Sequence, residues 1–286
     1  MDQAITAYIP PWAAAARLSF FAGILFVMVL WEYAAPKRDV TAERKTRWTA
    51  NLGVSALNTF VMYLAVPVAP LALAVIASER GWGLLNNTGL PFWASCIIGI
   101  LALDFIIYLQ HLMFHAVPVL WRLHMAHHSD LHIDATTGLR FHPLEILISV
   151  MIKLAAVVLL GPPAAAVLAF EIILNGTSMF NHGNVRLPEG LDRIVRFFLV
   201  TPDMHRVHHS VTIRETDSNF GFNLPWWDRI MGTYRAQPAA GHAAIVIGMS
   251  TRRRPVGLMT LLIFPLTGDP GRYAIGGNGN EPAHRG

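Results

Sequence analysis

Long apolar runs separated by short polar segments set the pattern of this chain. The runs cover residues 12–35, 52–77, 91–110 and 144–181. About 20 apolar residues in a helix cross the ~30 Å hydrocarbon core of a bilayer, so each run is long enough to span it. The last run carries Gly161-Pro162-Pro163 at its middle, which predicts a hairpin of two spans with its tip outside the cell. We therefore expect an all-α membrane protein with about four transmembrane helices, arranged as two hairpins.

The remaining segments are broken, short or polar. Pro67 and Pro70 are expected to kink the second run, because proline removes a helical hydrogen bond. Residues 255–265 are apolar but too short to span, which predicts an interfacial helix. Residues 183–242 are polar and are expected in the cytoplasm, and the tail from Gly268 predicts disorder.

Basic residues indicate the orientation of the spans. Lysines and arginines crowd the loop after the first run, at positions 37, 38, 44, 45 and 47. Such loops stay in the cytoplasm, so we expect the N-terminus outside and a cytoplasmic helical cap that carries the histidines. A cleaved signal peptide ending at Tyr33-Ala34-Ala35 is the alternative for the first run, but the basic loop favours an uncleaved span. The expected location is the inner membrane of a bacterial cell, with the active site on its cytoplasmic side.

Composition supports a membrane protein and narrows the chemistry. Charged residues make up 14% of the chain and hydrophobic residues 53%, whereas soluble proteins contain about 25% charged residues. The net charge of +4 does not indicate nucleic-acid binding, because the basic residues flank apolar runs. Cys96 is the only cysteine, which excludes an internal disulfide, thiolate zinc sites and iron–sulfur clusters. A metal site must therefore be built from histidine, with or without Asp or Glu.

Histidines recur at helical spacing. The first pair is His111 and His115, and two triplets follow with spacing i, i+3, i+4: His124, His127 and His128, then His205, His208 and His209. Residues at this spacing share a helix face, so each triplet is expected to aim its imidazoles in one direction. Thr201-Pro202 predicts a helix start before the last triplet.

Eight imidazoles beside apolar sequence require a physical reason. A lone histidine would more often be a hydrogen-bonded residue at the membrane interface. Several that converge are costly unless a cation holds them neutral and satisfied. Eight nitrogens are too many for one ion, so the pattern predicts two metal ions, and imidazole suits iron, zinc, copper or nickel.

Further polar residues lie close to these clusters in the sequence. His142 and His182 stand where the last apolar hairpin meets the cytoplasm and are additional ligand candidates, whereas His132 is expected to be an ordinary loop residue. Asp104 lies two helical turns before His111 and is expected to orient a ligating imidazole through its other nitrogen. A hydrogen bond between helices is the alternative for Asp104. Within the last hairpin, we expect Lys153 and Glu171 to snorkel, face the bundle or pair.

The ordered set His-x3-His, His-x2-His-His, His-x2-His-His, with apolar hairpins between, resembles the fatty acid hydroxylase/sterol desaturase superfamily of integral-membrane di-iron oxygenases. The likeness continues at Arg140-Phe-His-Pro-Leu-Glu145, Asn181-His-Gly-Asn184, Thr201 to Ser210, Asn219-Phe-Gly221 and Trp227 to Tyr234. It covers roughly residues 90–235. Leu112 departs from the pattern, because members often carry a basic residue after the first histidine.

The resemblance implies a site and a reaction. The iron-ligand role would fall on His111, His115, His124, His127, His128, His142, His182, His205, His208 and His209. Two iron ions, replaced by zinc in some preparations, would activate O2 to hydroxylate or desaturate a C–H position of a sterol, fatty acyl chain or related lipid. Electrons would come from a separate reductase, ferredoxin or cytochrome.

Three regions and one rival function complete the expectations. Residues 1–89 would form an N-terminal transmembrane region with two spans, 90–242 the oxygenase domain, and 243–286 an interfacial segment with a disordered tail. The alternative is a zinc-dependent membrane hydrolase or a metal-handling protein, which metal analysis would distinguish from an iron oxygenase.

Overall fold

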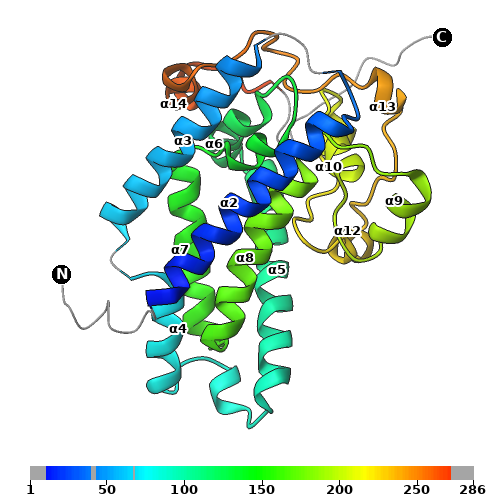
Figure 1. Cartoon of the computed structure of the whole chain (residues 1–286). Coiled ribbons are helices and arrows are strands. Elements are labelled where there is room, and N and C mark those ends of the chain that lie inside the picture. The colour runs from blue at the N-terminus through cyan, green and yellow to red at the C-terminus, as the bar shows by residue number, and fades with distance from the viewer. Residues whose placement is uncertain (1–10, 40–42, 67, 272–286) are drawn as a thin grey trace.

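The chain folds into a tall helical bundle with a cap of short helices at one end (Figure 1). The computed structural model describes residues 11–39, 43–66 and 68–271. Five candidate membrane spans lie in this part of the chain. They are α2 (Pro11–Ala34), α3 with α4 (Arg44–Ala65 and Pro70–Glu79), α5 (Phe92–Ala116), α7 (Pro143–Leu160) and α8 (Ala164–Asn181). The expected number of about four is too low by one, because the three single apolar runs and the hairpin of two spans together make five.

Proline and glycine interrupt the apolar runs where the sequence indicates. The second run is broken into two helices, and Pro70 occupies the first position of α4, where its missing N–H costs least. Pro67, the other expected kink, lies outside the described residues. Gly161 ends α7 with a φ of +64°, a conformation that favours glycine. A Cβ on Gly161 would also stand 2.5 Å from the carbonyl oxygen of Trp82, so the tip of the hairpin packs closely on the loop before α5.

The cap consists of short helices. They are α6 (Pro118–His128), η2 (Ala135–Leu139), α9 (Glu189–Val195), α10 (Pro202–His208), α11 (Ile213–Thr216), α12 (Trp226–Met231), α13 (Gly241–Ala244) and α14 (Leu258–Thr267). The short apolar helix expected at 255–265 corresponds to α14, which packs on α3 and α6. Arg122 fixes it by donating to the carbonyl oxygen of Pro265 at 2.7 Å. Most of the tail that was expected to be disordered, residues 272–286, lies outside the described residues.

The bundle encloses an apolar core and a largely buried charge cluster on its last hairpin. Leu103 and Ile107 of α5 pack with Val157 of α7 and Phe170 of α8. Lys153 lies 3.3 Å from the carboxylate of Glu171, which confirms that the charges of the last hairpin pair. Arg17 of α2 approaches the same carboxylate at 3.4 Å. Such pairing offsets much of the cost of charge in an apolar bundle.

Two N-terminal helices fix the loops of the cap. Glu32 of α2 is 1% exposed, and its Oε1 accepts from the backbone N–H groups of Ala135 at 2.7 Å and Asn184 at 2.9 Å. Arg47 of α3 pairs with Asp130 and Asp134 in the loop after α6. Because those loops adjoin the histidine clusters, residues of α2 and α3 help to shape the site.

Candidate metal centre

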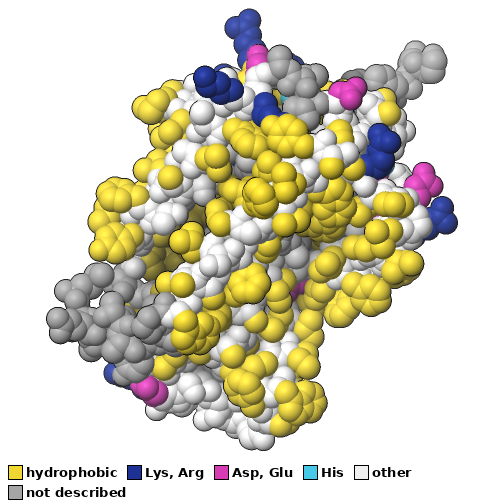
Figure 2. Space-filling model, in the orientation of Figure 1, with side chains coloured by type: hydrophobic (Ala, Val, Ile, Leu, Met, Phe, Trp, Pro, Cys, Tyr) yellow, Lys and Arg dark blue, Asp and Glu magenta, His cyan; other side chains and the backbone are white. Residues whose placement is uncertain are grey.

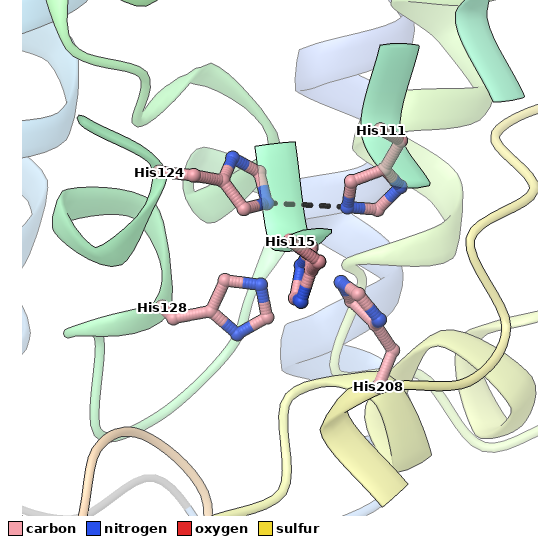
Figure 3. Close-up of side chains that lie close together, drawn as sticks. All are labelled: His111, His115, His124, His128 and His208. Carbon is pink, nitrogen blue, oxygen red and sulfur yellow. Dashed lines mark hydrogen bonds between the residues drawn. The ribbon is translucent and has the colours of Figure 1, made fainter. Parts of the chain in front are cut away.

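Nine of the ten candidate histidines gather in two buried groups among the described residues. Group one contains His111, His115, His124, His128 and His208, and group two contains His127, His182, His205 and His209. Within each group the available ring nitrogens lie within 4.8 Å of one another. Figure 3 shows the imidazoles of group one facing a common centre from three helices of the bundle and cap. The site therefore lies where the cap closes one end of the bundle.

Helical geometry divides each triplet between the two groups. His124 and His128 of α6 belong to group one, whereas His127 belongs to group two. The last triplet reverses this pattern, because His205 and His209 belong to group two and His208 to group one. The expectation that a triplet aims in one direction is wrong in this respect. Residues i and i+4 lie about 40° apart around a helix, while i+3 and i+4 lie about 100° apart, so one triplet serves both centres.

Local sequence positions the last triplet as predicted. Thr201 caps α10, and its side-chain oxygen accepts from the N–H of Met204 at 3.4 Å. Pro202 occupies the first turn of the helix. This helix start places all three histidines within the following two turns, on the buried side of the cap.

Burial keeps these imidazoles neutral. It lowers the pKa of His208 to about 3 and that of His182 to about 4. The pKa values of His205 and His209 are also lowered well below the ordinary histidine value, first by burial and then by neighbouring imidazoles. A neutral imidazole has one N–H and one lone pair, and the lone pair is what binds a metal.

Backbone carbonyls determine which nitrogen carries the hydrogen. The Nδ1 atoms of four histidines face carbonyl oxygens: His111 faces Phe220 at 2.8 Å, His208 faces Ser218 at 2.8 Å, His182 faces Ser178 at 2.7 Å and His127 faces Arg140 at 3.1 Å. A carbonyl oxygen only accepts, so each Nδ1 must donate. Each Nε2 is therefore a lone pair, and the tautomers suit metal binding through Nε2.

The Nε2 atoms approach one another too closely for an empty site. His111 and His124 have Nε2 atoms 3.1 Å apart (dashed line in Figure 3), and His182 has its Nε2 3.1 Å from that of His127 and 3.0 Å from that of His205. In the His111–His124 and His182–His127 pairs both Nε2 atoms carry lone pairs, which repel at this distance unless a cation lies between them. Two ligands at right angles on an ion with bonds of about 2.1 Å would be about 3.0 Å apart, so the spacing fits a metal bound by imidazoles.

Among the described residues, other buried ring nitrogens have no hydrogen-bond partner. They include Nε2 of His115 and His208, and both nitrogens of His128 and His209. A buried polar atom without a hydrogen bond costs about 1–3 kcal/mol. Coordination of metal ions would satisfy them together, so the residues of both groups fit the ions that the sequence predicts.

Glu145 is a site residue that the sequence analysis did not single out. It lies in the first turn of α7, and its Oε1 is 2.6 Å from Nδ1 of His124. The carboxylate therefore orients a group-one imidazole and makes it a stronger donor. The sequence does contain a signal for this role, because Glu145 is an acid at the beginning of an apolar run, two residues after the helix-starting Pro143.

Glu145→Gln should weaken metal binding in group one about 10- to 100-fold, the usual effect of losing a residue that orients a ligand. The amide can present either its oxygen or its NH2 group to His124, so the tautomer is no longer fixed. Metal competition titration of the purified protein measures this change. Gln110→Ala, which removes a part-buried hydrogen bond from Gln110 of α5 to Ser149 of α7, is the control and should leave metal affinity unchanged.

Asp104 acts on a different partner from the one expected. Its Oδ2 accepts from Nε1 of Trp227 at 2.7 Å, whereas Nδ1 of His111 faces the Phe220 carbonyl. Asp228, the residue after Trp227, accepts from the N–H groups of Phe220 and Gly221, both at 2.8 Å. Asp104 therefore makes the hydrogen bond between helices that was its alternative role, and it acts on His111 only indirectly, through α12 and the loop before it.

His142 lies outside both groups. Its Nδ1 accepts from the N–H of Leu144, which caps α7, and its Nε2 is 3.1 Å from the carbonyl oxygen of Leu262 in α14. Both ring nitrogens are thus engaged away from the metal centre, and the geometry does not favour His142 as a ligand. His132 also belongs to neither group.

His142→Ala should retain the full metal content and lose about 1 kcal/mol of stability, the usual cost of removing a helix cap. Elemental analysis together with thermal unfolding of the purified protein tests this expectation. Loss of a metal ion from the variant would instead make His142 a ligand.

Comparison with known proteins places the site in a family context. Residues 96–233 match the family model for fatty acid hydroxylases. The chain is 31% identical to the ornithine lipid hydroxylase of Rhizobium tropici, 30% identical to human alkylglycerol monooxygenase and 27% identical to the cholesterol 25-hydroxylase of Rattus norvegicus. The aligned parts cover 52%, 51% and 50% of this chain, but only 44%, 31% and 47% of the respective relatives. No solved structure matches the chain.

Proposed function

Because the chain belongs to the fatty acid hydroxylase/sterol desaturase superfamily, we propose that it is a membrane-bound di-iron oxygenase that hydroxylates or desaturates an unactivated C–H position of a lipid. One observation carries the proposal. At the end of an apolar bundle lie two buried groups of imidazoles, and within each group Nε2 lone pairs point at one another. The three relatives named above are two hydroxylases and a monooxygenase, and these activities support the same reaction class.

In this proposal, group one and group two each hold one iron ion. Bound iron supplies the reduction of O2 that oxidation of an unactivated C–H bond requires. Hydroxylation consumes one O2, two electrons and two protons, and yields the alcohol and one water. The two electrons come from a separate reductase, ferredoxin or cytochrome.

The chain's own residues prepare the site. The carbonyls of Phe220 and Ser218 keep the hydrogens of His111 and His208 on Nδ1, and Glu145 does the same for His124. Burial of all nine imidazoles excludes water, which protects a reactive centre from side reactions. Lipid would approach from the apolar bundle side and present its C–H bond to the faces of the two groups.

The proposal also includes the cellular membrane and the side of it on which the metal centre lies. Basic residues in the loop between α2 and α3 favour a cytoplasmic position for the cap and its metal centre. We place the protein in a bacterial inner membrane, and we assign the oxygenase unit to residues 90–242.

Comparative lipid analysis tests the function in cells. Cells that produce the wild-type chain should contain a lipid that is hydroxylated or desaturated relative to cells that produce His208→Ala at the same level. The variant removes one ligand of group one and leaves the fold's apolar core intact. Identical lipid profiles in the two strains would contradict a lipid C–H substrate.

Metal analysis separates the rival function. Purified protein that retains zinc, and whose activity does not depend on iron, would favour a membrane hydrolase or a metal-handling role. Iron-dependent O2 consumption in the presence of a reductant would favour the oxygenase.

A further inference from the structure

An apolar patch on the cap faces outward beside the spanning helices. It is formed by α9, α12 and the turn after α9, and we name it the ledge. Its side chains are Leu191, Ile194, Phe197, Phe198, Ile230 and Met231, each between 47% and 71% exposed. In Figure 2 hydrophobic side chains gather at the lower right edge of the cap, where Figure 1 places α9 and α12. A patch of this kind on a folded protein marks a surface that something covers.

The two parts of the ledge are held together by specific contacts. Trp226 donates from Nε1 to the carbonyl oxygen of Phe197 at 2.7 Å, and Arg229 donates to the carbonyl oxygen of Arg196 at 3.2 Å. The guanidinium of Arg229 also lies over the rings of Tyr234 at 4.0 Å and Phe197 at 5.3 Å. These contacts lock α12 to the turn after α9, so the exposed rings of the ledge are held in place.

The contact between α12 and α5 indicates how deep the ledge lies along the candidate membrane spans. Trp227 of α12 donates to Asp104 and packs on Phe105, with ring centroids 4.8 Å apart. Asp104 lies midway along α5 (Phe92–Ala116), about 18 Å from either end at 1.5 Å per residue. The short helix α12 is therefore attached to the middle of a candidate span, and not to its end.

Aromatic residues indicate where the bilayer begins. Trp82 and Trp93 are 40% and 66% exposed near the start of α5, and tryptophan favours the membrane–water interface. A hydrocarbon layer of ~30 Å that begins there takes up about 20 residues of α5 and ends close to His111. Asp104 then lies about 10 Å inside that layer. Ile230 and Met231 follow Trp227 by three and four residues, so at most about 6 Å of helix rise separates them from it.

We propose that the ledge is immersed in the lipid leaflet nearest the metal centre, although residues 183–242 read as a polar segment outside the membrane. The occupant of the surface is the bilayer itself, because α12, which carries part of the ledge, is attached to the middle of the candidate span α5. Glu189 and Arg193 form the charged rim of α9, with side chains 93% and 78% exposed. An apolar face with a charged rim is the arrangement of a segment that lies in the membrane interface.

Spin labelling of the full-length protein in phosphatidylcholine vesicles tests the ledge. In a Cys96→Ser background, single cysteines replace Phe198 and Ile230 on the ledge, Ile97 on the exposed side of α5 and Ala240 in the cap. All four positions are exposed, so a label does not disturb packing. Collision with apolar O2 and with a water-soluble nickel complex is measured at each position.

The expected result is that labels at 198 and 230 favour O2 over the nickel complex severalfold, as the label at 97 does, while the label at 240 favours nickel. Labels at 198 and 230 that behave like the one at 240 would overturn the proposal and leave the ledge for a water-soluble partner. Low collision with both reagents, together with spin–spin broadening between chains, would overturn it in favour of a second copy of this chain.

Discussion

His209→Ala should lower the metal content of the purified protein from two ions to one per chain and abolish turnover. Group two has four imidazoles, so the variant leaves three. His209 is 0% exposed, and its ring packs between those of His127 and His128, at centroid distances of 4.8 and 4.6 Å. Alanine there removes a ligand and leaves a void that no neighbouring donor fills. Elemental analysis and a lipid oxidation assay on the same preparation measure both effects.

His132→Ala is the matched control for that variant. His132 is a histidine of the same cap, half-buried, and lies outside both groups. It should retain two metal ions and wild-type turnover. Equal activity in His209→Ala and His132→Ala would contradict the assignment of group two to the reaction.

Arg47→Ala should destabilise the protein by about 3–5 kcal/mol, the range for removal of one partner from a buried ion pair. Arg47 is 3% exposed, its Nη2 donates to Asp130 at 3.0 Å, and its Nη1 lies 2.9 Å from Asp134. Burial raises the pKa of Asp130, but Arg47 and Arg140 outweigh burial and hold it below the usual aspartate value. The variant leaves two buried carboxylates beside α6, and thermal unfolding in detergent measures the loss.

The exposed pair Arg193–Glu189 provides the comparison. Its side chains are 78% and 93% exposed, and such pairs contribute little to stability. Arg193→Ala should therefore leave the unfolding temperature almost unchanged. Because a lowered pKa stabilises the fold above the ordinary aspartate pKa, the difference between Arg47→Ala and wild type should shrink as the pH falls toward the acid range. Equal unfolding temperatures for Arg47→Ala and Arg193→Ala at neutral pH would show that the buried pair does not contribute to the stability of the fold.

The sequence predicted the helical class and nearly all of the metal-binding candidates because both rest on local periodicity. Apolar runs of spanning length became candidate spans, and the histidines at i, i+3, i+4 lie in the two groups together with His111, His115 and His182. The pairing of Lys153 with Glu171 was also foreseeable, since an acid and a base in an apolar hairpin have few other partners.

The rest depended on tertiary contacts that no local pattern reports. Which histidines of a triplet belong to which group depends on how α6 and α10 are rotated relative to each other. The carbonyls that fix the imidazole tautomers belong to backbone at Ser218 and Phe220, and a carbonyl leaves no mark in the sequence. Asp104 accepts a hydrogen bond from Trp227, which is 123 residues away in the sequence. The role of His142, by contrast, does have a local signal, because a residue directly before a helix-starting proline is in the position of a helix cap.

The most direct test of the central claim is mass spectrometry of lipids after oxidation with labelled oxygen. Iron-loaded protein in vesicles made from the lipids of its own cells is given a reductant, an electron carrier and 18O2. We predict that a lipid gains one 18O atom, or loses two hydrogens while the label appears in water, and that Glu145→Gln reduces the yield. An unchanged lipid pool, from protein that holds iron in both groups and receives electrons, would contradict the account.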